Sequence, residues 1–221
     1  MCGRYTLTTD GRVLADEFGI DELGTWTPRF NIAPTQLVAA IVRTRAEPQA
    51  AKLHWGLVPG WAKDRKAAAR AINARAETVA EKPTFRAAFK RRRCLVLADG
   101  YFEWVKRDER KQPYYITPQD GRPFAFAGLW ERWSEDGEAP YYSCTIITCA
   151  ASADLAELHH RMPVTLAHND YASWLDPESD PAAQLEKLGP APSGTFIPRP
   201  VSTIVNSPAN DDHRCIEAIT A

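Results

Sequence analysis

The second residue of the chain is a cysteine, which becomes the N-terminal residue if the initiator methionine is removed. Removal of Met1, which a small residue at position 2 permits, would expose a thiol and a free α-amine on adjacent carbons of Cys2. These groups have ordinary pKa values of about 8.5 and about 7.7 to 8.0, so both are partly nucleophilic near neutral pH. The expected target of such a 1,2-aminothiol is an aldehyde.

Three further groups of polar residues could assist this chemistry. Glu103 lies among aromatic residues in a strand-like pattern, where burial would raise its pKa and suit it to proton transfer, although the alternation fits an outward-facing carboxylate equally well. His159 and His160 are adjacent, so in a strand or at a helix end their side chains would point in different directions. Either imidazole suits acid or base work, and either could be structural. Asn73 and Arg75 could bind a sugar and a phosphate.

The charged residues are unevenly distributed along the chain. The formal net charge is −1, yet residues 61–93 contain eleven Lys and Arg against three acidic residues. From residue 150 onward there are four basic and ten acidic residues. This segregation is typical of one basic face for a polyanion, and a solvated loop and helix face is the alternative. Trp61, beside a Pro-Gly turn, is either core packing or a platform on which a nucleic-acid base stacks.

The composition is that of an ordinary globular protein. With 221 residues, 44% hydrophobic and 25% charged, the sequence predicts one domain over residues 1–221. It contains no apolar run long enough to span a membrane and no signal-peptide pattern, so we expect a cytoplasmic protein. The five cysteines are odd in number and form no C-x-x-C pair. We therefore expect no disulfide framework, no metal and no cofactor.

The elements that must position these residues are mostly strands. Hydrophobic patterns, caps and turn residues predict an α+β fold with a mostly antiparallel, strongly curved or barrel-like β-sheet core and peripheral helices. Residues 28–34 and 72–78 are expected as loops, with a hairpin loop at 107–112 and a turn at 134–137. The predicted strands are 4–8, 37–43, 52–58, 94–98, 101–106, 114–117, 124–133, 141–149 and 201–205, and the predicted helices are 9–18, 84–90, 152–158, 169–175 and 181–188.

An ordered set of short motifs resembles the SRAP family, the SOS response-associated peptidase fold. The motifs are MCGR at 1–4, FNIAP at 30–34, WGLVPGW at 55–61, NARAET at 73–78, DGYFEW at 99–104, Thr148 and HHRMP at 159–163, with residues 201–206 resembling the final strand. Each is weak alone, but their order over most of the chain is specific. One departure is Ala62, which follows Trp61 where relatives have paired aromatic residues.

The resemblance implies a catalytic group of Cys2, Asn73, Glu103 and His159 that crosslinks abasic sites in single-stranded DNA during the DNA damage response. His159 would open the sugar ring, the Cys2 amine would form a Schiff base, Glu103 would move protons, and the thiol would close a thiazolidine. Asn73 would hold the N-terminus and the sugar oxygen in register. Met1 would be removed by autoproteolysis or by an aminopeptidase, and a lyase-type activity is also implied.

The resemblance further implies that the partner is single-stranded DNA with abasic sites, so the bound protein would associate with the nucleoid. Nothing in the sequence demands more than a monomer or indicates an obligate protein partner. Two other functions fit the same residues. One is an N-terminal-nucleophile amidohydrolase or cysteine peptidase that does not require DNA, and the other is a non-enzymatic module for single strands. The residues expected to contact DNA are Arg4, Asn31, Pro34, Trp61, Arg75, Arg86 and Thr148.

Overall fold

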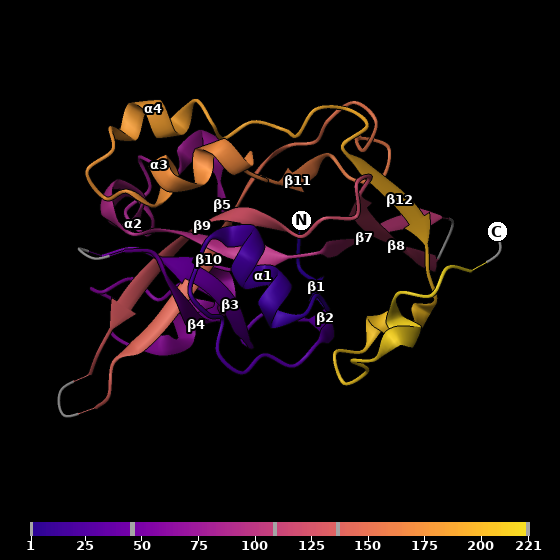
Figure 1. Cartoon of the computed structure of the whole chain (residues 1–221), viewed down its shortest axis with the longest axis horizontal. Coiled ribbons are helices and arrows are strands. Elements are labelled where there is room, and N and C mark those ends of the chain that lie inside the picture. The colour runs from indigo at the N-terminus through magenta and orange to yellow at the C-terminus, as the bar shows by residue number, and fades with distance from the viewer. Residues whose placement is uncertain (1, 45–46, 108–109, 136–137, 220–221) are drawn as a thin grey trace.

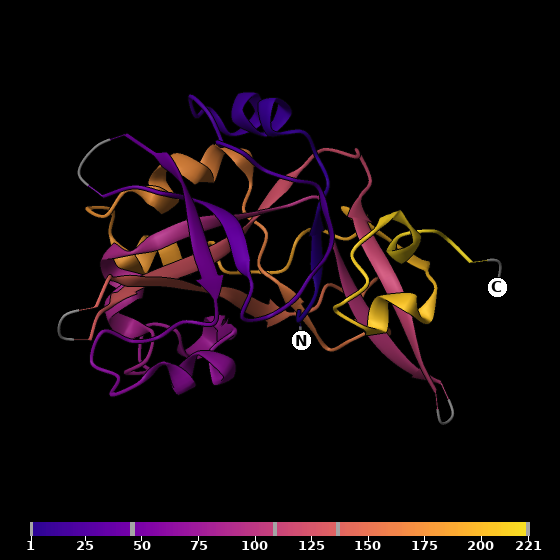
Figure 2. The same cartoon turned by 90° about the horizontal axis from the view of Figure 1, so that it is seen from below.

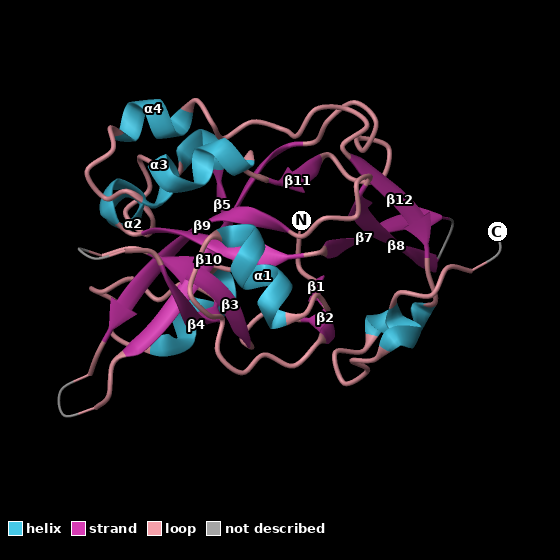
Figure 3. Cartoon of the chain, in the orientation of Figure 1, coloured by secondary structure: helices cyan, strands magenta, loops and turns pink. Residues whose placement is uncertain are grey.

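The computed structural model of the chain describes residues 2–44, 47–107, 110–135 and 138–219 (Figure 1), and strands predominate over short helices (Figure 3). The strands are β1 (Tyr5–Leu7), β2 (Arg29–Ile32), β3 (Leu37–Val42), β4 (Gln49–Trp55), β5 (Asn73–Arg75), β6 (Arg93–Ala98), β7 (Gly100–Arg107), β8 (Arg110–Pro118), β9 (Phe124–Trp133), β10 (Tyr141–Ala150), β11 (Arg161–Pro163) and β12 (Phe196–Pro200). The α-helices are α1 (Gly11–Phe18), α2 (Arg86–Arg91), α3 (Tyr171–Leu175) and α4 (Pro181–Leu185). Short 3₁₀ helices occupy Arg65–Arg70, Ala76–Thr78, His168–Asp170, Thr203–Asn206 and His213–Cys215.

Five strands close into a barrel. β10 pairs with β4, β4 with β3, β3 with β6, β6 with β9, and β9 returns to β10. Every pair is antiparallel except β10 with β4. β6 is buried along its whole length, because α3 packs against this strand and Trp174 donates a hydrogen bond to the carbonyl of Cys94 at 2.9 Å. A strand buried on both faces accounts for the unbroken apolar run of β6.

The C-terminal half of β10 pairs with two further strands outside the barrel. There β5 pairs with it in parallel, with Asn73 opposite Ile146, and β11 pairs antiparallel, with Met162 opposite Cys149. Chain segments that are far apart in the sequence, at residues 73–75 and 161–163, therefore flank one strand. The chain begins in this central region, close to β11 and β1, in both views (Figures 1 and 2).

A second sheet of five strands, in the order β12-β8-β7-β1-β2, is antiparallel throughout. The C-terminal segment covers one side of it, as Figure 2 shows, and forms a small separate core. That core contains Phe102, Tyr115, Val201, Val205 and Cys215. At the edge, β12 carries Pro198 and Pro200, which is where a sheet tolerates prolines because no neighbouring strand needs their missing N–H groups.

Local capping signals explain the best-predicted element. Asp10 accepts a hydrogen bond from the backbone N–H of Arg12, and α1 ends at Gly19, whose φ of 63° is left-handed. The curved, mostly antiparallel sheet with peripheral helices is confirmed, and the predicted strands before residue 150 lie close to observed ones. The tips of the predicted hairpin loop and turn, at residues 108–109 and 136–137, lie outside the described residues.

Five local predictions were wrong. The expected loops at 28–34 and 72–78 contain β2 and β5, because both segments find partner strands that are distant in sequence. The hairpin loop expected at 107–112 is largely strand, since β7 and β8 stay paired through Arg107 and Arg110. Residues 153–158 form successive turns instead of a helix. The expected strand at 201–205 is a single bridge at Val201 followed by a 3₁₀ helix.

Candidate active site

Cys2 lies inside the protein, with no exposed surface. The side-chain amide of Asn73 donates a hydrogen bond to the backbone carbonyl of Cys2 at 2.8 Å. β5 delivers Asn73 to this point because it pairs with β10. The other end of the same amide, Oδ1, is buried and accepts no hydrogen bond from the described residues. Asn73 therefore fixes the main chain at Cys2 and keeps an acceptor available for a ligand hydroxyl.

Glu103 is 4% exposed, so it faces inward and the outward-facing alternative is wrong. Simple alternation fails here because both faces of β7 are covered, with Phe102 on the other face packed under the C-terminal segment. Antiparallel pairing of Tyr5 with Tyr101 brings the start of the chain alongside Glu103. Burial raises the pKa of the Glu103 carboxyl, and burial together with the charge of Glu103 raises the pKa of the Cys2 thiol.

His159 and His160 lie in a turn, and their rings stack with centroids 4.4 Å apart, so the expectation of divergent side chains is wrong. His159 is half-buried and His160 is exposed. Nδ1 of His159 lies 3.0 Å from both the amide nitrogen and the carbonyl oxygen of Arg161, so it accepts from the N–H in one tautomer and donates to the carbonyl in the other. Burial lowers the pKa of His159, so the ring stays neutral at pH 7.

The four residues expected to be catalytic are linked in space. Asn73 contacts Cys2 directly, and the charge of Glu103 acts on the Cys2 thiol. A positive charge on His160, whose ring stacks on that of His159, would lower the pKa of Glu103. The site therefore combines a main-chain anchor and a buried carboxyl with raised pKa beside one cysteine, with a stacked imidazole pair whose charge can act on the carboxyl. Among the described residues, no group of three or more His, Cys, Asp or Glu side chains is arranged to bind a metal ion.

Arg161 is a residue beside this site that sequence reasoning did not single out, although it lies within the HHRMP motif. Its guanidinium pairs with the carboxylate of Glu77 through contacts of 2.5 and 3.0 Å and donates to the carbonyl of Thr148 at 2.6 Å. This ion pair lowers the pKa of Glu77. The arginine thus joins β11 to the segment after β5, on the two sides of β10.

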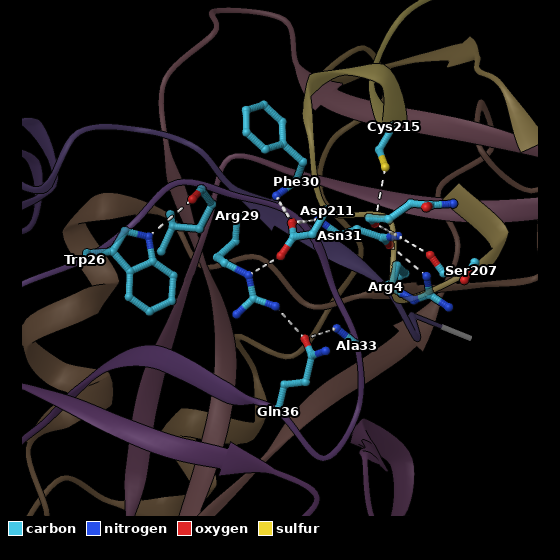
Figure 4. A network of polar contacts seen from close by, with 12 residues as sticks. Arg4, Trp26, Arg29, Phe30, Asn31, Ala33, Gln36, Ser207, Asp211 and Cys215 are labelled. Atoms are coloured by element: carbon cyan, nitrogen blue, oxygen red, sulfur yellow. Dashed lines mark hydrogen bonds and ion pairs between the residues drawn. The ribbon is translucent and has the colours of Figure 1, made fainter. Parts of the chain in front are cut away.

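Two residues expected to contact DNA are instead tied into the protein (Figure 4). Asn31 has no exposed surface, and its Nδ2 donates to the carbonyls of Val205, Ser207 and Asn210 in the C-terminal segment. Arg4 donates to Oδ1 of Asn31 at 2.7 Å and to the carbonyl of Val205 at 2.8 Å. These contacts are internal and give no support to a role of Asn31 in DNA contact.

The other expected DNA contacts differ in exposure. Trp61 is 67% exposed, and Arg75 and Arg86 are also exposed. Pro34 is half-buried in the loop before β3, and Thr148 is fully buried on β10. The exposed members are therefore available to a ligand as the chain stands. The roles of all of these residues stay predictions.

The basic segment at 61–93 is not uniformly a surface feature. Arg93 is 1% exposed and donates to the carbonyls of Phe89, Lys90, Trp174 and Asp176 at the C-terminal ends of α2 and α3. Arg65 lies over the rings of Trp133 and Tyr141 and pairs with Glu138 at 2.6 Å. Arg92 pairs with Glu131 at 2.8 Å. Part of the positive charge therefore stabilises the fold, and the other Lys and Arg of this segment are mostly exposed.

Comparison with known proteins identifies the family. The family described as SOS response associated peptidase (SRAP) matches residues 1–208. The chain belongs to the SRAP family. It is 40% identical to the abasic site processing protein YoaM of Bacillus subtilis, over 99% of this chain and 98% of the relative. It is 33% identical to the abasic site processing protein HMCES of Gallus gallus, over 89% of this chain and 68% of the relative.

Solved structures share the SRAP fold described above. A crystal structure of a protein from Bacteroides thetaiotaomicron superposes with a TM-score of 0.88 at 25% identity, covering 99% of this chain and all of that one. A second, from Bordetella bronchiseptica, gives a TM-score of 0.78 at 26% identity, covering 91% of this chain and all of that one. In this SRAP chain, no described helix has the length and apolar character that crossing a membrane requires.

Proposed function

We propose that this SRAP protein processes abasic sites in DNA by capturing them covalently in single strands, through the amine and thiol of Cys2 after Met1 has been removed. Met1 itself lies outside the described residues. The observation that carries the proposal is the hydrogen bond from Asn73 to the carbonyl of Cys2, which fixes the start of the chain beside buried Glu103. The names of the relatives, abasic site processing proteins, support the choice of substrate.

The reaction follows from the chemistry of the two nucleophiles. An abasic sugar equilibrates between a closed hemiacetal and an open aldehyde, and the Cys2 amine attacks C1′ of the aldehyde. The resulting carbinolamine loses water and becomes an imine. The thiol sulfur then bonds to the imine carbon while its proton passes to nitrogen, which closes a five-membered thiazolidine. The sum is one new C–N bond, one new C–S bond and one released water.

The surrounding residues suit distinct steps. His159, whose Nδ1 is engaged by the main chain of Arg161, would use Nε2 to donate a proton to the ring oxygen as the hemiacetal opens. Glu103, whose pKa is raised by burial, would protonate the departing hydroxyl and later accept the thiol proton. Asn73 has a buried Oδ1 without a described partner, which could accept a hydrogen bond from a sugar hydroxyl. His159 and Glu103 can thus transfer the protons that the reaction requires, and Asn73 can hold the sugar by a hydrogen bond.

DNA would reach the site across the exposed basic surface. Trp61 would stack on a base flanking the lesion, and Arg75 and Arg86 would contact phosphates. Only single-stranded DNA leaves base faces free for such stacking. A cysteine peptidase or amidohydrolase would not need these exposed cationic residues, so the alternative that does not require DNA has less support.

The test is a mixture of Met1-processed protein and a single-stranded oligonucleotide with one abasic site, analysed on a denaturing gel and by intact mass. We expect a covalent species whose mass is the sum of the two components less one water. Cys2→Ala should form none, whereas Cys215→Ala, which removes a different buried thiol, should retain adduct formation. An equal adduct from Cys2→Ala, or none from the wild type, would overturn the proposal. Turnover of a peptide without DNA would favour the amidohydrolase.

A further inference from the structure

The carboxylate of Asp99 binds the segment that follows Cys2 with an unusual number of contacts. Its Oδ2 accepts hydrogen bonds from the backbone N–H groups of Thr8 and Thr9, at 2.5 and 2.8 Å. The same oxygen accepts from the hydroxyls of Thr8 and Thr9, at 2.8 and 2.9 Å. The other oxygen, Oδ1, accepts from the hydroxyl of Thr6 at 2.5 Å. Three threonines within four residues thus converge on one side chain.

This attachment compensates for a short strand. β1 has three residues, and its register with β7 consists of Tyr5 opposite Tyr101 and Thr6 opposite Gly100. On its other side β1 pairs irregularly with β2, with a shift between Tyr5 and Leu7. Two residue pairs offer few backbone hydrogen bonds to fix the register, and a slip of one residue would turn every side chain to the opposite face. The hydrogen bonds of the Asp99 side chain provide further contacts that fix the register of β1 on β7.

Tyr115 and Gly100 complete the attachment. The hydroxyl of Tyr115 lies 2.8 Å from the hydroxyl of Thr6, so Thr6 is held from two directions. The Tyr115 ring passes so close to Gly100 that a Cβ at this position would lie 2.4 Å from ring atoms. Only glycine allows this approach without a shift of the ring. The residues just before Tyr101 and Glu103 therefore pack closely around β1, the strand that follows Cys2.

We propose that Asp99 is a positioning residue for adduct formation: by holding Thr6, Thr8 and Thr9, it fixes the register of β1 on β7 and so the place where Cys2 meets Glu103 and Asn73. This rests on the proposed function. Asp99 touches neither the DNA nor the reacting atoms and acts through the strand. Effective alignment of reacting groups depends on displacements of about 1 Å, so a small shift of β1 affects the rate strongly.

The decisive experiment separates rate from binding. Asp99→Asn places an amide group against the N–H donors of Thr8 and Thr9, and we expect adduct formation at saturating abasic DNA to slow about tenfold or more. The dissociation constant for intact single-stranded DNA should stay unchanged. Asp99→Glu, which keeps the carboxylate, should restore part of the rate. If Asp99→Asn folds poorly, the double variant Thr8→Ala and Thr9→Ala removes two hydroxyl donors and should slow the reaction in the same direction.

A matched control guards against a purely structural effect. Leu175→Ala removes a buried side chain from α3, away from Cys2, and should lower the melting temperature while leaving the rate per folded molecule unchanged. If Asp99→Asn behaves like Leu175→Ala, or if it weakens DNA binding at an unchanged rate, the positioning role is overturned.

A second readout needs no DNA. Cys2 is fully buried, as are Cys94 and Cys144 in the barrel. In Met1-processed protein, Asp99→Asn should increase the rate at which iodoacetamide alkylates Cys2, with Cys94 and Cys144 as internal controls in the same peptide map. Equal alkylation of Cys2 in both proteins would contradict the proposal. An absence of adduct from the wild type would refute the proposed function instead, and the alkylation rates would still test Asp99.

Discussion

Two aspartates, Asp99 and Asp211, bind the neighbouring strands β1 and β2 of the second sheet through different kinds of donor. Asp99 holds β1 and the residues after it through uncharged donors, the hydroxyls of three threonines and the amides of two of them. Asp211 accepts from the backbone N–H groups of Phe30 and Asn31 on β2, at 2.6 and 2.9 Å, and also forms an ion pair with Arg29. One aspartate lies in the turn before β7, and the other lies in the C-terminal segment.

The difference lies in what each attachment controls. Asp99 joins parts of the chain that carry Cys2 and Glu103, so its geometry is transmitted to the reacting groups. Asp211 joins the C-terminal segment to β2, and Arg29 continues the contact to Gln36, which accepts from the backbone N–H of Ala33 in the loop that contains Pro34 (Figure 4). The Asp99 attachment should govern the rate of adduct formation, and the Asp211 attachment should govern the free energy of unfolding. Four variants, from the largest expected effect to the smallest, test this division.

Glu103→Gln should have the largest effect on rate, because it removes the proton carrier that the register of β1 on β7 brings to Cys2. We expect adduct formation to slow by about 10² to 10⁴ without loss of DNA binding, measured by single-turnover gels and filter binding. A rate within twofold of the wild type would contradict the role of Glu103.

The same variant should also change the dependence of stability on pH. Burial raises the folded-state pKa of Glu103 above its unfolded value, so the folded wild type loses stability as pH rises through the unfolded pKa towards the folded one. Glu103→Gln should therefore be more stable than the wild type at pH 7, and this difference should vanish below about pH 4, where the unfolded carboxyl is also protonated. Urea unfolding at both pH values measures it.

Asn31→Ala should have the largest effect on stability. It leaves the carbonyls of Val205, Ser207 and Asn210 without their buried donor and removes an acceptor from Arg4. We expect the free energy of unfolding to fall by about 3 kcal/mol in urea titrations. Limited proteolysis should then cut the C-terminal segment first. Protection equal to that of the wild type would mean that the C-terminal core holds this segment without Asn31.

Gly100→Ala tests the attachment of β1 around Asp99, because the added methyl group would clash with the Tyr115 ring. The added methyl would displace the Tyr115 ring and break its contact with Thr6, at a cost of about 1 to 3 kcal/mol. Gly189→Ala is the matched control, because a Cβ there meets no atom within 4 Å, and its effect should stay within about 0.5 kcal/mol. Equal stability of the two variants would show that the ring moves freely.

Asp211→Asn should have the smallest effect and defines the contrast with Asp99→Asn. It weakens the ion pair with Arg29 and the contacts to β2, which should lower the free energy of unfolding by about 1 kcal/mol. Its adduct rate at saturating DNA should equal that of the wild type. A loss of rate as large as that of Asp99→Asn would show that the two attachments are one unit.

Local signals made part of this fold predictable from sequence. α1 is bounded by Asp10 and Gly19, and β9 is apolar from Phe124 to Trp130, with predicted and observed bounds that agree. Failures occur where distant segments decide the outcome. Residues 201–205 are rich in β-branched side chains, yet the segment turns into a 3₁₀ helix because Val205 packs in the C-terminal core and its carbonyl receives Arg4 and Asn31. β12 was missed because its two prolines conceal an edge strand.

The candidate site was predicted by resemblance more than by pattern. Alternation left the orientation of Glu103 open, since no local rule foretells that the C-terminal segment covers the opposite face of β7. Charge counting also overstated the basic face, because it could not tell that Arg93 is buried between two helix ends. For Asn31, nothing in the sequence indicated that its side chain binds carbonyls of the C-terminal segment. Contacts between segments that are distant in sequence determine the environments of Glu103, Arg93 and Asn31.

The bond between Asn73 and Cys2 has a consequence for protein engineering. Asn73 holds the main-chain carbonyl of Cys2, a group that every amino acid possesses, so docking of the N-terminus does not depend on the side chain. Serine at position 2 would keep the amine in place but supply a much poorer nucleophile for ring closure. Such a protein should stop at the imine, which borohydride reduces and water reverses. One substitution would thus replace the proposed thiazolidine by an imine that water can hydrolyse.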